Sequence, residues 1–103
     1  MISQADKKRF KAIAHHLKPI VFVAANGLSD SVVREIERAL ADHELIKIRI
    51  AAGNREKRRE MIEAASAATR SEIVQTIGSI AVLYRAAAEP DPSLSNILRT
   101  NVF

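Results

Sequence analysis

The sequence contains no cysteine, which excludes disulfide bonds, zinc–thiolate sites and thiol catalysis. No stretch approaches the ~20 consecutive apolar residues that a membrane-spanning helix needs. The N-terminal segment becomes charged at Asp6 and Lys7, before any long apolar core, so it does not resemble a secretory signal. These absences predict a cytoplasmic protein that has no membrane partner.

Recognisable catalytic motifs are also missing. The chain has no nucleophile elbow, no phosphate-loop lysine motif and no spaced cluster of histidine and acidic residues that would ligate a metal. Neighbouring helical positions point about 100° apart, so His15 and His16 cannot both hold one ion without help. We therefore expect no enzymatic activity, no cofactor, no metal and no small-molecule substrate.

Aromatic residues are scarce and make up only 4% of the chain. Phe10 and Phe22 fall in apolar patterns that predict burial, which leaves Tyr84 and Phe103. The sequence therefore does not predict a sheet surface that stacks nucleobases on aromatic rings. If a nucleic acid binds, contacts to its phosphates from lysine, arginine and backbone amides should dominate.

Positive charge is in excess and is unevenly distributed. Sixteen basic and twelve acidic residues give a net charge of +4. Residues 1–18 hold five basic residues and one acidic residue, and residues 44–60 hold six and three. The two blocks could share one face and attract a polyanion, or they could be separate solvated surfaces.

The spacing of apolar residues predicts a layered αβ sandwich with the order helix, strand, helix, strand, helix, strand, strand. A capping box at Ser3 and Asp6 opens the first helix, and Pro19 ends it. In residues 43–50, isoleucines alternate with Lys47 and Arg49, which predicts a half-buried strand with a basic outer face. The other elements are expected at residues 20–24, from Ser29 or Asp30 to about 43, at 55–69, and at 72–77 and 80–85 around a Gly78-Ser79 hairpin turn.

The pattern ends after Arg85, where Pro90 and Pro92 mark a linker or tail. We therefore expect one domain over residues 1–86 and a C-terminal tail over residues 87–103. Residues 93–101 could form one more short helix or no regular structure.

The segment that follows Pro19 is the most informative part of the chain. An apolar run ends in Asn26-Gly27, and helix-starting residues follow directly. A tight turn and a helix N-terminus at the end of a strand would suit an anion such as phosphate. Ala24-Ala25-Asn26-Gly27 also occupies the place of a KH-type GXXG loop, although Asn-Gly is equally common as a purely structural turn.

Three segments in this order resemble the YhbY-like family of CRM domains (chloroplast RNA splicing and ribosome maturation). The first runs from His16-Leu17-Lys18-Pro19 to Asn26-Gly27-Leu28, and the second is residues 43–50. The third runs from Val74-Gln75-Thr76-Ile77-Gly78 to Val82-Leu83-Tyr84-Arg85. The resemblance covers about residues 3–86.

The resemblance implies a two-layer sandwich in which helices pack on a four-stranded mixed sheet, similar to the C-terminal domain of translation initiation factor three. It also implies RNA binding, association with precursors of the large ribosomal subunit and a role in ribosome maturation. The family's proposed RNA contact is a GXXG loop with nearby basic residues, and here Ala24 takes the place of the first glycine. The candidate RNA-binding residues are Lys18, Ala24, Ala25, Asn26, Gly27, Lys47, Arg49, Arg55, Arg58 and Arg59.

A second hypothesis is a protein-binding adaptor that docks on a ribosomal or assembly protein through the first helix or the tail. Its binding would survive ribonuclease and depend only weakly on basic residues. The sequence leaves open which RNA is bound, which assembly step is served and what the oligomeric state is.

Overall fold

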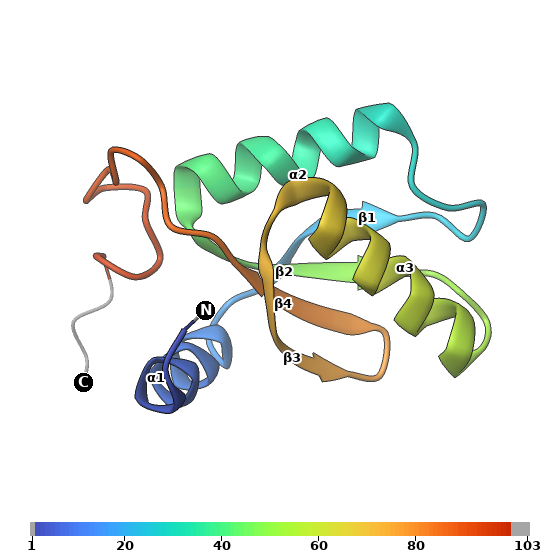
Figure 1. The fold of residues 1–103 in the computed structure, drawn as a ribbon, viewed down its shortest axis with the longest axis horizontal. Coiled ribbons are helices and arrows are strands. Elements are labelled where there is room, and N and C mark those ends of the chain that lie inside the picture. Colours follow the sequence, from blue (N-terminus) through green and yellow to red (C-terminus); the bar gives the residue numbers. More distant parts are fainter. Residues whose placement is uncertain (1, 100–103) are drawn as a thin grey trace.

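The computed structural model describes residues 2–99 and has the element order that the sequence predicts (Figure 1). Three helices alternate with the first three strands, and the last two strands form a hairpin that completes a four-stranded sheet. The elements are α1 (Gln4–Ala14), β1 (Pro19–Val23), α2 (Asp30–His43), β2 (Leu45–Ile50), α3 (Arg55–Thr69), β3 (Glu72–Ile77) and β4 (Ile80–Tyr84). The predicted α/β class and the mixed sheet are confirmed.

The strand order in the sheet is β1-β2-β4-β3, so β4 is an interior strand although it is the last in sequence. β1 pairs with β2 in parallel, and β4 pairs antiparallel with both β2 and β3. A helix connects β1 to β2 and another connects β2 to β3, as crossovers in layered αβ folds require. β1 and β3 are the two edges.

Helices cover both faces of the sheet, and each face has its own apolar cluster. The helices α2 and α3 pack over the inward isoleucines of β2 and over Ala81 and Leu83 of β4. The helix α1 packs on the opposite face, where Phe10 and Ile13 meet Val74 and Val82. In Figure 1 α1 lies across the sheet from α2, and it covers only the part of its face that is far from the right-hand loops.

The helices begin at side-chain caps that the sequence encodes locally. Ser3 Oγ accepts a hydrogen bond from the Asp6 N–H, and Ser29 Oγ accepts one from the Val32 N–H. At the start of α3, Asn54 Oδ1 accepts a hydrogen bond from the Lys57 N–H. Each cap satisfies a backbone donor that has no partner within the helix.

Residues 87–99 fold back onto the junction between α2 and β2. Ser95 and Asn96 are buried there, and the Asn96 side chain donates a 2.7 Å hydrogen bond to the Leu45 carbonyl. Within residues 93–99 the chain forms turns rather than the short helix that was one of two expectations, and residues 100–101 lie outside the described range. Among the described residues, no helix is long and apolar enough to span a membrane.

Candidate nucleic-acid interface

Three loops meet at one end of the sheet, where β1, β2 and β3 end, and each carries one of the chain's three glycines. The loops are residues 24–29 with Gly27, residues 51–54 with Gly53, and the β3–β4 turn with Gly78. Backbone hydrogen bonds hold them together, since Ala51 N–H donates to the Val23 carbonyl at 2.9 Å and Ile50 N–H to the Ser79 carbonyl at 2.8 Å. We call this side the glycine-loop edge; it is the right-hand end of Figure 1.

Residues 24–27 form the tight turn that the sequence predicts. The Gly27 N–H donates a 3.0 Å hydrogen bond to the Ala24 carbonyl. Gly27 has a φ of 105°, and, its two chain neighbours apart, no heavy atom lies within 4 Å of the place where a Cβ would stand. Its backbone therefore needs glycine for conformation and is open to the approach of a ligand.

The N-terminus of α2 is less available to a phosphate than the sequence suggested. The Ser29 hydroxyl already accepts from the Val32 N–H, and Asp30 places a carboxylate in the first turn. That negative charge complements the helix dipole and would repel an incoming anion. The accessible part of this corner is the open backbone around Gly27.

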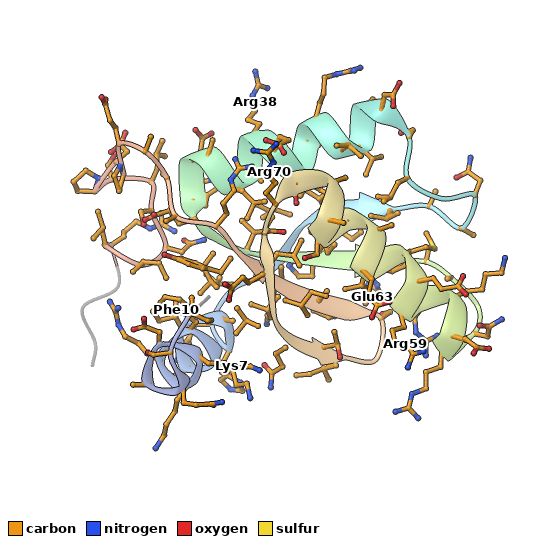
Figure 2. All side chains as sticks on the ribbon, viewed as in Figure 1. Lys7, Phe10, Arg38, Arg59, Glu63 and Arg70 are labelled. Carbon is orange, nitrogen blue, oxygen red and sulfur yellow. The ribbon has the colours of Figure 1, made fainter. Side chains whose placement is uncertain are left out.

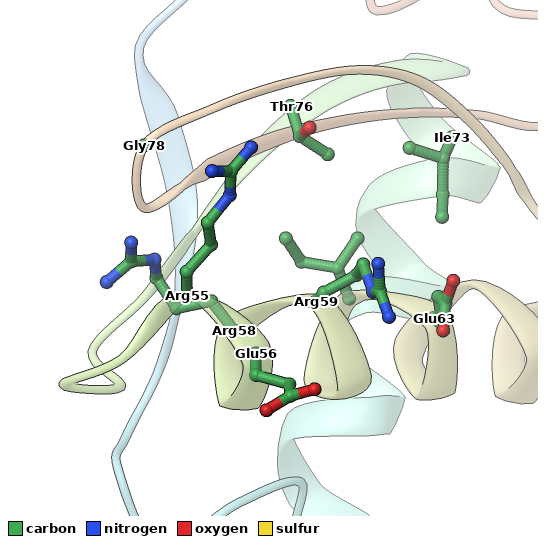
Figure 3. A pocket seen from close by; sticks show the side chains of 9 residues that line it. Arg55, Glu56, Arg58, Arg59, Glu63, Ile73, Thr76 and Gly78 are labelled. Carbon is green, nitrogen blue, oxygen red and sulfur yellow. The ribbon is translucent and has the colours of Figure 1, made fainter.

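Arginines from the first turns of α3 line a groove of about 790 Å³ beneath the β3–β4 turn (Figure 3). Arg55 and Arg59 are exposed, whereas Arg58 is half-buried and its Nη1 donates to the Ala52 carbonyl at 3.3 Å. Glu63 lies beside Arg59, and Glu56 points away from the turn. Arg55 and Arg59 are thus placed to contact phosphate, and Arg58 fixes the loop that presents them.

The two basic residues of β2 have different roles, although they share one face. The Lys47 side chain is half-buried and donates a 3.1 Å hydrogen bond to the Leu17 carbonyl, which ties β2 to the chain after α1. Arg49, one residue before the end of β2, is exposed. Lys47 therefore contributes to the fold, whereas Arg49 is free to meet a ligand near the glycine-loop edge.

Lys18 precedes β1, so it stands at the opposite end of that strand from Gly27. A strand of five residues spans roughly 16 Å. Of the candidate residues, the structure brings together Ala24, Ala25, Asn26, Gly27, Arg49, Arg55, Arg58 and Arg59 at one end of the molecule and leaves Lys18 and Lys47 near the end of α1. In Figure 2, Arg59 lies on the side of the loops, and Lys7 of α1 lies away from them.

Comparison with known families decides the assignment of this architecture. Residues 2–85 match the profile of the CRS1/YhbY (CRM) domain. The chain belongs to the CRM-domain family. The match covers all seven helices and strands of this CRM domain and stops at Arg85.

Several relatives of this CRM domain are named for RNA binding. A probable RNA-binding protein of Pseudomonas aeruginosa is 49% identical over 98 residues, which is 95% of this chain and 94% of the relative. An RNA-binding protein of Haemophilus influenzae is 46% identical over 88 residues, or 85% of this chain and 89% of the relative. The solution structure of a hypothetical protein from Staphylococcus aureus superposes with a TM-score of 0.77 at 35% identity, covering 86% of this chain and 93% of that one.

The alanine at the first position of the GXXG-like loop fits this CRM domain without backbone strain. Among the described residues, the non-glycine positions with positive φ are Glu44 and Arg70, so Ala24 has a negative φ. Alanine adopts such a conformation freely. Of the two glycine positions in a GXXG loop, only the last, Gly27, has a positive φ that needs glycine, and this chain has glycine there.

The prediction that the Phe22 ring is buried is wrong. Its side chain is 63% exposed, while Val21 and Val23 on either side are buried. All residues of β1 are apolar, so alternation could not tell which ones face the helices. Phe22 lies on the face opposite α2 and α3, beyond the part that α1 covers, on an edge strand of the sheet.

Within residues 2–99, no three histidine, aspartate or glutamate side chains are grouped closely enough to hold an ion.

Proposed function

We propose that this CRM domain is a non-catalytic RNA-binding protein of the cytoplasm that associates with precursors of the large ribosomal subunit and assists their maturation. Family membership and the names of the relatives support RNA as the partner. The observation that carries the proposal is the glycine-loop edge, where an open backbone turn lies at the same end of the molecule as exposed arginines.

Phosphate contacts supply the binding energy in this proposal. A phosphate of the RNA approaches the backbone at Gly27, which no side chain shields. Arg49, Arg55 and Arg59 surround it with charge that the fold leaves exposed. Arg58 and Lys47 act indirectly, because each holds a backbone carbonyl that positions a loop or strand.

Phosphate contacts carry little sequence information, so RNA shape provides the selectivity. Bends and junctions of a folded precursor RNA arrange its phosphates in space, and the loops and arginines would select among such arrangements.

Sedimentation of tagged protein from cell lysate tests the proposal directly. We expect comigration with large-subunit precursors at low salt, lost on raising the salt or digesting the RNA. With purified RNA, neutralisation of about three phosphates, one by each of Arg49, Arg55 and Arg59, predicts a slope of log K against log salt of about −2.1 to −2.7, depending on strandedness. Protein that remains at the top of the gradient at low salt, or a slope near zero, would contradict the proposal.

The alternative is a protein-binding adaptor, and one observation favours it. Leu94 and Leu98 of the docked tail are exposed, at 38% and 50%, and stand four residues apart. An adaptor that used them would stay with its partner after ribonuclease treatment and at moderate salt. Substitution of both leucines by serine would then remove the protein from its complex, whereas the RNA-binding proposal predicts no change.

A further inference from the structure

Phe22 belongs to a row of side chains that crosses all four strands on the uncovered part of the sheet. The pairing register places Phe22 opposite Arg49, Arg49 opposite Ile80, and Ile80 opposite Ile77. Directly paired residues of neighbouring strands project to the same face. We call Phe22, Arg49, Ile80 and Ile77 the open row.

The open row exposes an unusual amount of apolar surface. Phe22 is 63% exposed and Ile77 is 62% exposed. They are the two most exposed large apolar side chains among the described residues. Exposed apolar side chains gathered in one row usually mark a contact surface.

Cations rather than carboxylates lie beside the end of the open row that Ile77 and Ile80 form. Arg49 lies inside the row, and a groove of about 470 Å³ between the sheet and α1 adjoins Ile77 and Ile80. The groove is also lined by Lys11, His15, Lys47 and Gln75, and none of the described residues that line it is acidic. Its volume lies within the range of about 300–1,000 Å³ that is typical of small-molecule sites.

The open row places the flat ring of Phe22 beside Arg49, among apolar side chains and near further cations. This combination matches an unpaired nucleotide, which has an apolar base and a charged phosphate. Aromatic and apolar side chains take the face of the base, and arginine takes its phosphate or stacks on it. A protein partner of the open row would need carboxylates to pair these cations, whereas RNA supplies negative charge at every residue. The charge of the surroundings therefore favours single-stranded RNA as the occupant.

We propose that the open row is a stacking surface for one or two unpaired bases of the bound RNA, with Phe22 as its platform. This inference rests on the proposed function, which it extends from phosphates to bases. An RNA strand whose phosphates lie at the glycine-loop edge then lays its neighbouring bases across the sheet toward α1. The protein recognises a single-stranded segment adjacent to the structured part of its RNA.

The chain contains no tryptophan, so Phe22→Trp introduces a single fluorescent probe at the proposed platform. The probe RNAs are a decamer of oligoadenylate, an abasic decamer with the same number of phosphates, and a duplex. We expect the adenylate decamer to quench Phe22→Trp strongly, and the abasic and duplex forms to quench it little. Leu98→Trp, on the exposed tail, is the matched control and should respond to none of them.

Phe22→Ala gives the affinity readout. Loss of one stacked base should weaken binding of the adenylate decamer by about 5- to 150-fold, while the salt slope stays unchanged because no cation is removed. Because the ring is largely exposed, the variant should fold normally, which circular dichroism can verify.

The outcomes separate this inference from the proposed function. Wild-type protein that binds RNA with a steep salt slope, but with equal affinity after Phe22→Ala, would overturn the stacking surface and leave RNA binding intact. Wild-type protein that binds no RNA at low salt would overturn both. Quenching of Phe22→Trp by RNA-free large-subunit proteins, with none by the oligonucleotides, would assign the open row to a protein instead.

Discussion

The hydroxyl of Ser95 donates a 2.7 Å hydrogen bond to the carboxylate of Glu44, fifty-one residues earlier in the chain. The other carboxylate oxygen accepts the Ala87 N–H at 2.8 Å. Glu44 is buried and has a φ of 61°, a region that non-glycine residues rarely occupy. This side chain therefore holds the tail at Ala87 and at Ser95 against the junction between α2 and β2.

Glu44→Gln should release that segment. An amide nitrogen in place of one oxygen faces a donor, and the lost pairing should lower the free energy of unfolding by about 1–3 kcal/mol. Urea unfolding followed by circular dichroism measures this change. The Asn96 N–H, which donates to the His43 carbonyl, should also exchange with solvent faster. Glu89→Gln, at an exposed tail position, is the control and should stay within about 0.5 kcal/mol of wild type.

Removing two exposed cations at the glycine-loop edge should weaken RNA binding without loss of fold. Arg49→Gln with Arg55→Gln is expected to reduce the magnitude of the salt slope by about two, one for each phosphate contact. The matched control is Arg34→Gln with Arg38→Gln, which removes the same charge from exposed positions of α2; Figure 2 shows Arg38 pointing away from the sheet. Equal slopes for the two double variants would contradict a localised phosphate site.

Lys47 and Arg58 should not be included in such a test, although the sequence made both candidate RNA-binding residues. Each is half-buried and holds a backbone carbonyl, of Leu17 and Ala52 respectively. Substitution by glutamine would confuse loss of charge with a change in loop position.

Gly27→Ala and Ala24→Gly should have unequal effects on stability. A side chain at a φ of 105° is strained, so Gly27→Ala should lower the free energy of unfolding by about 1–3 kcal/mol and weaken RNA binding by displacing the turn. Ala24→Gly meets no such barrier and should cost no more than about 1 kcal/mol, from the added freedom of the unfolded chain. Thermal unfolding measures the stability of each variant. RNA titration at a temperature below the unfolding midpoints of both variants measures the affinity. A Gly27→Ala variant as stable as wild type would contradict this account of the turn.

Glu72 should make stability depend on pH in the acidic range. The Ile2 N–H donates a 3.1 Å hydrogen bond to its carboxylate, and this bond lowers the pKa of Glu72 in the folded state. The stabilising contribution is then complete above the pKa of the unfolded chain, about 4.3, and is lost as the pH falls through the lower folded value. Wild type should be more stable than Glu72→Gln at pH 7, with a difference that shrinks below pH 4. A difference that is constant with pH would contradict the role of the ionised carboxylate.

Local signals in the sequence predicted most of the fold. Ser3 and Ser29 cap helices as expected, α3 spans the predicted residues 55–69, and Gly78-Ser79 forms the hairpin turn. These features depend on interactions within a few residues, which a pattern can show.

The features that the sequence did not predict depend on long-range packing. Phe22 is exposed because β1 is at the sheet edge and α1 stops short of it, and neither fact can be read from an all-apolar strand. Ser95 and Asn96 are buried because Glu44 and the Leu45 carbonyl satisfy them, although polar residues after two prolines are typical of a solvated tail. At the candidate site, the sequence found the loop and the charges, but separating contact residues from fold-stabilising ones required the hydrogen bonds of Lys47 and Arg58.

The place of β4 between β2 and β3 has a consequence for how the protein is made. β4 is the last strand to be synthesised, and until it is available β2 and β3 have no partner between them. A nascent chain that ends before Ile80 can pair only β1 with β2 and leaves most strand edges unsatisfied. The sheet should therefore close in a single late step after translation has passed Tyr84, so that the open row is assembled only once the whole domain has been made.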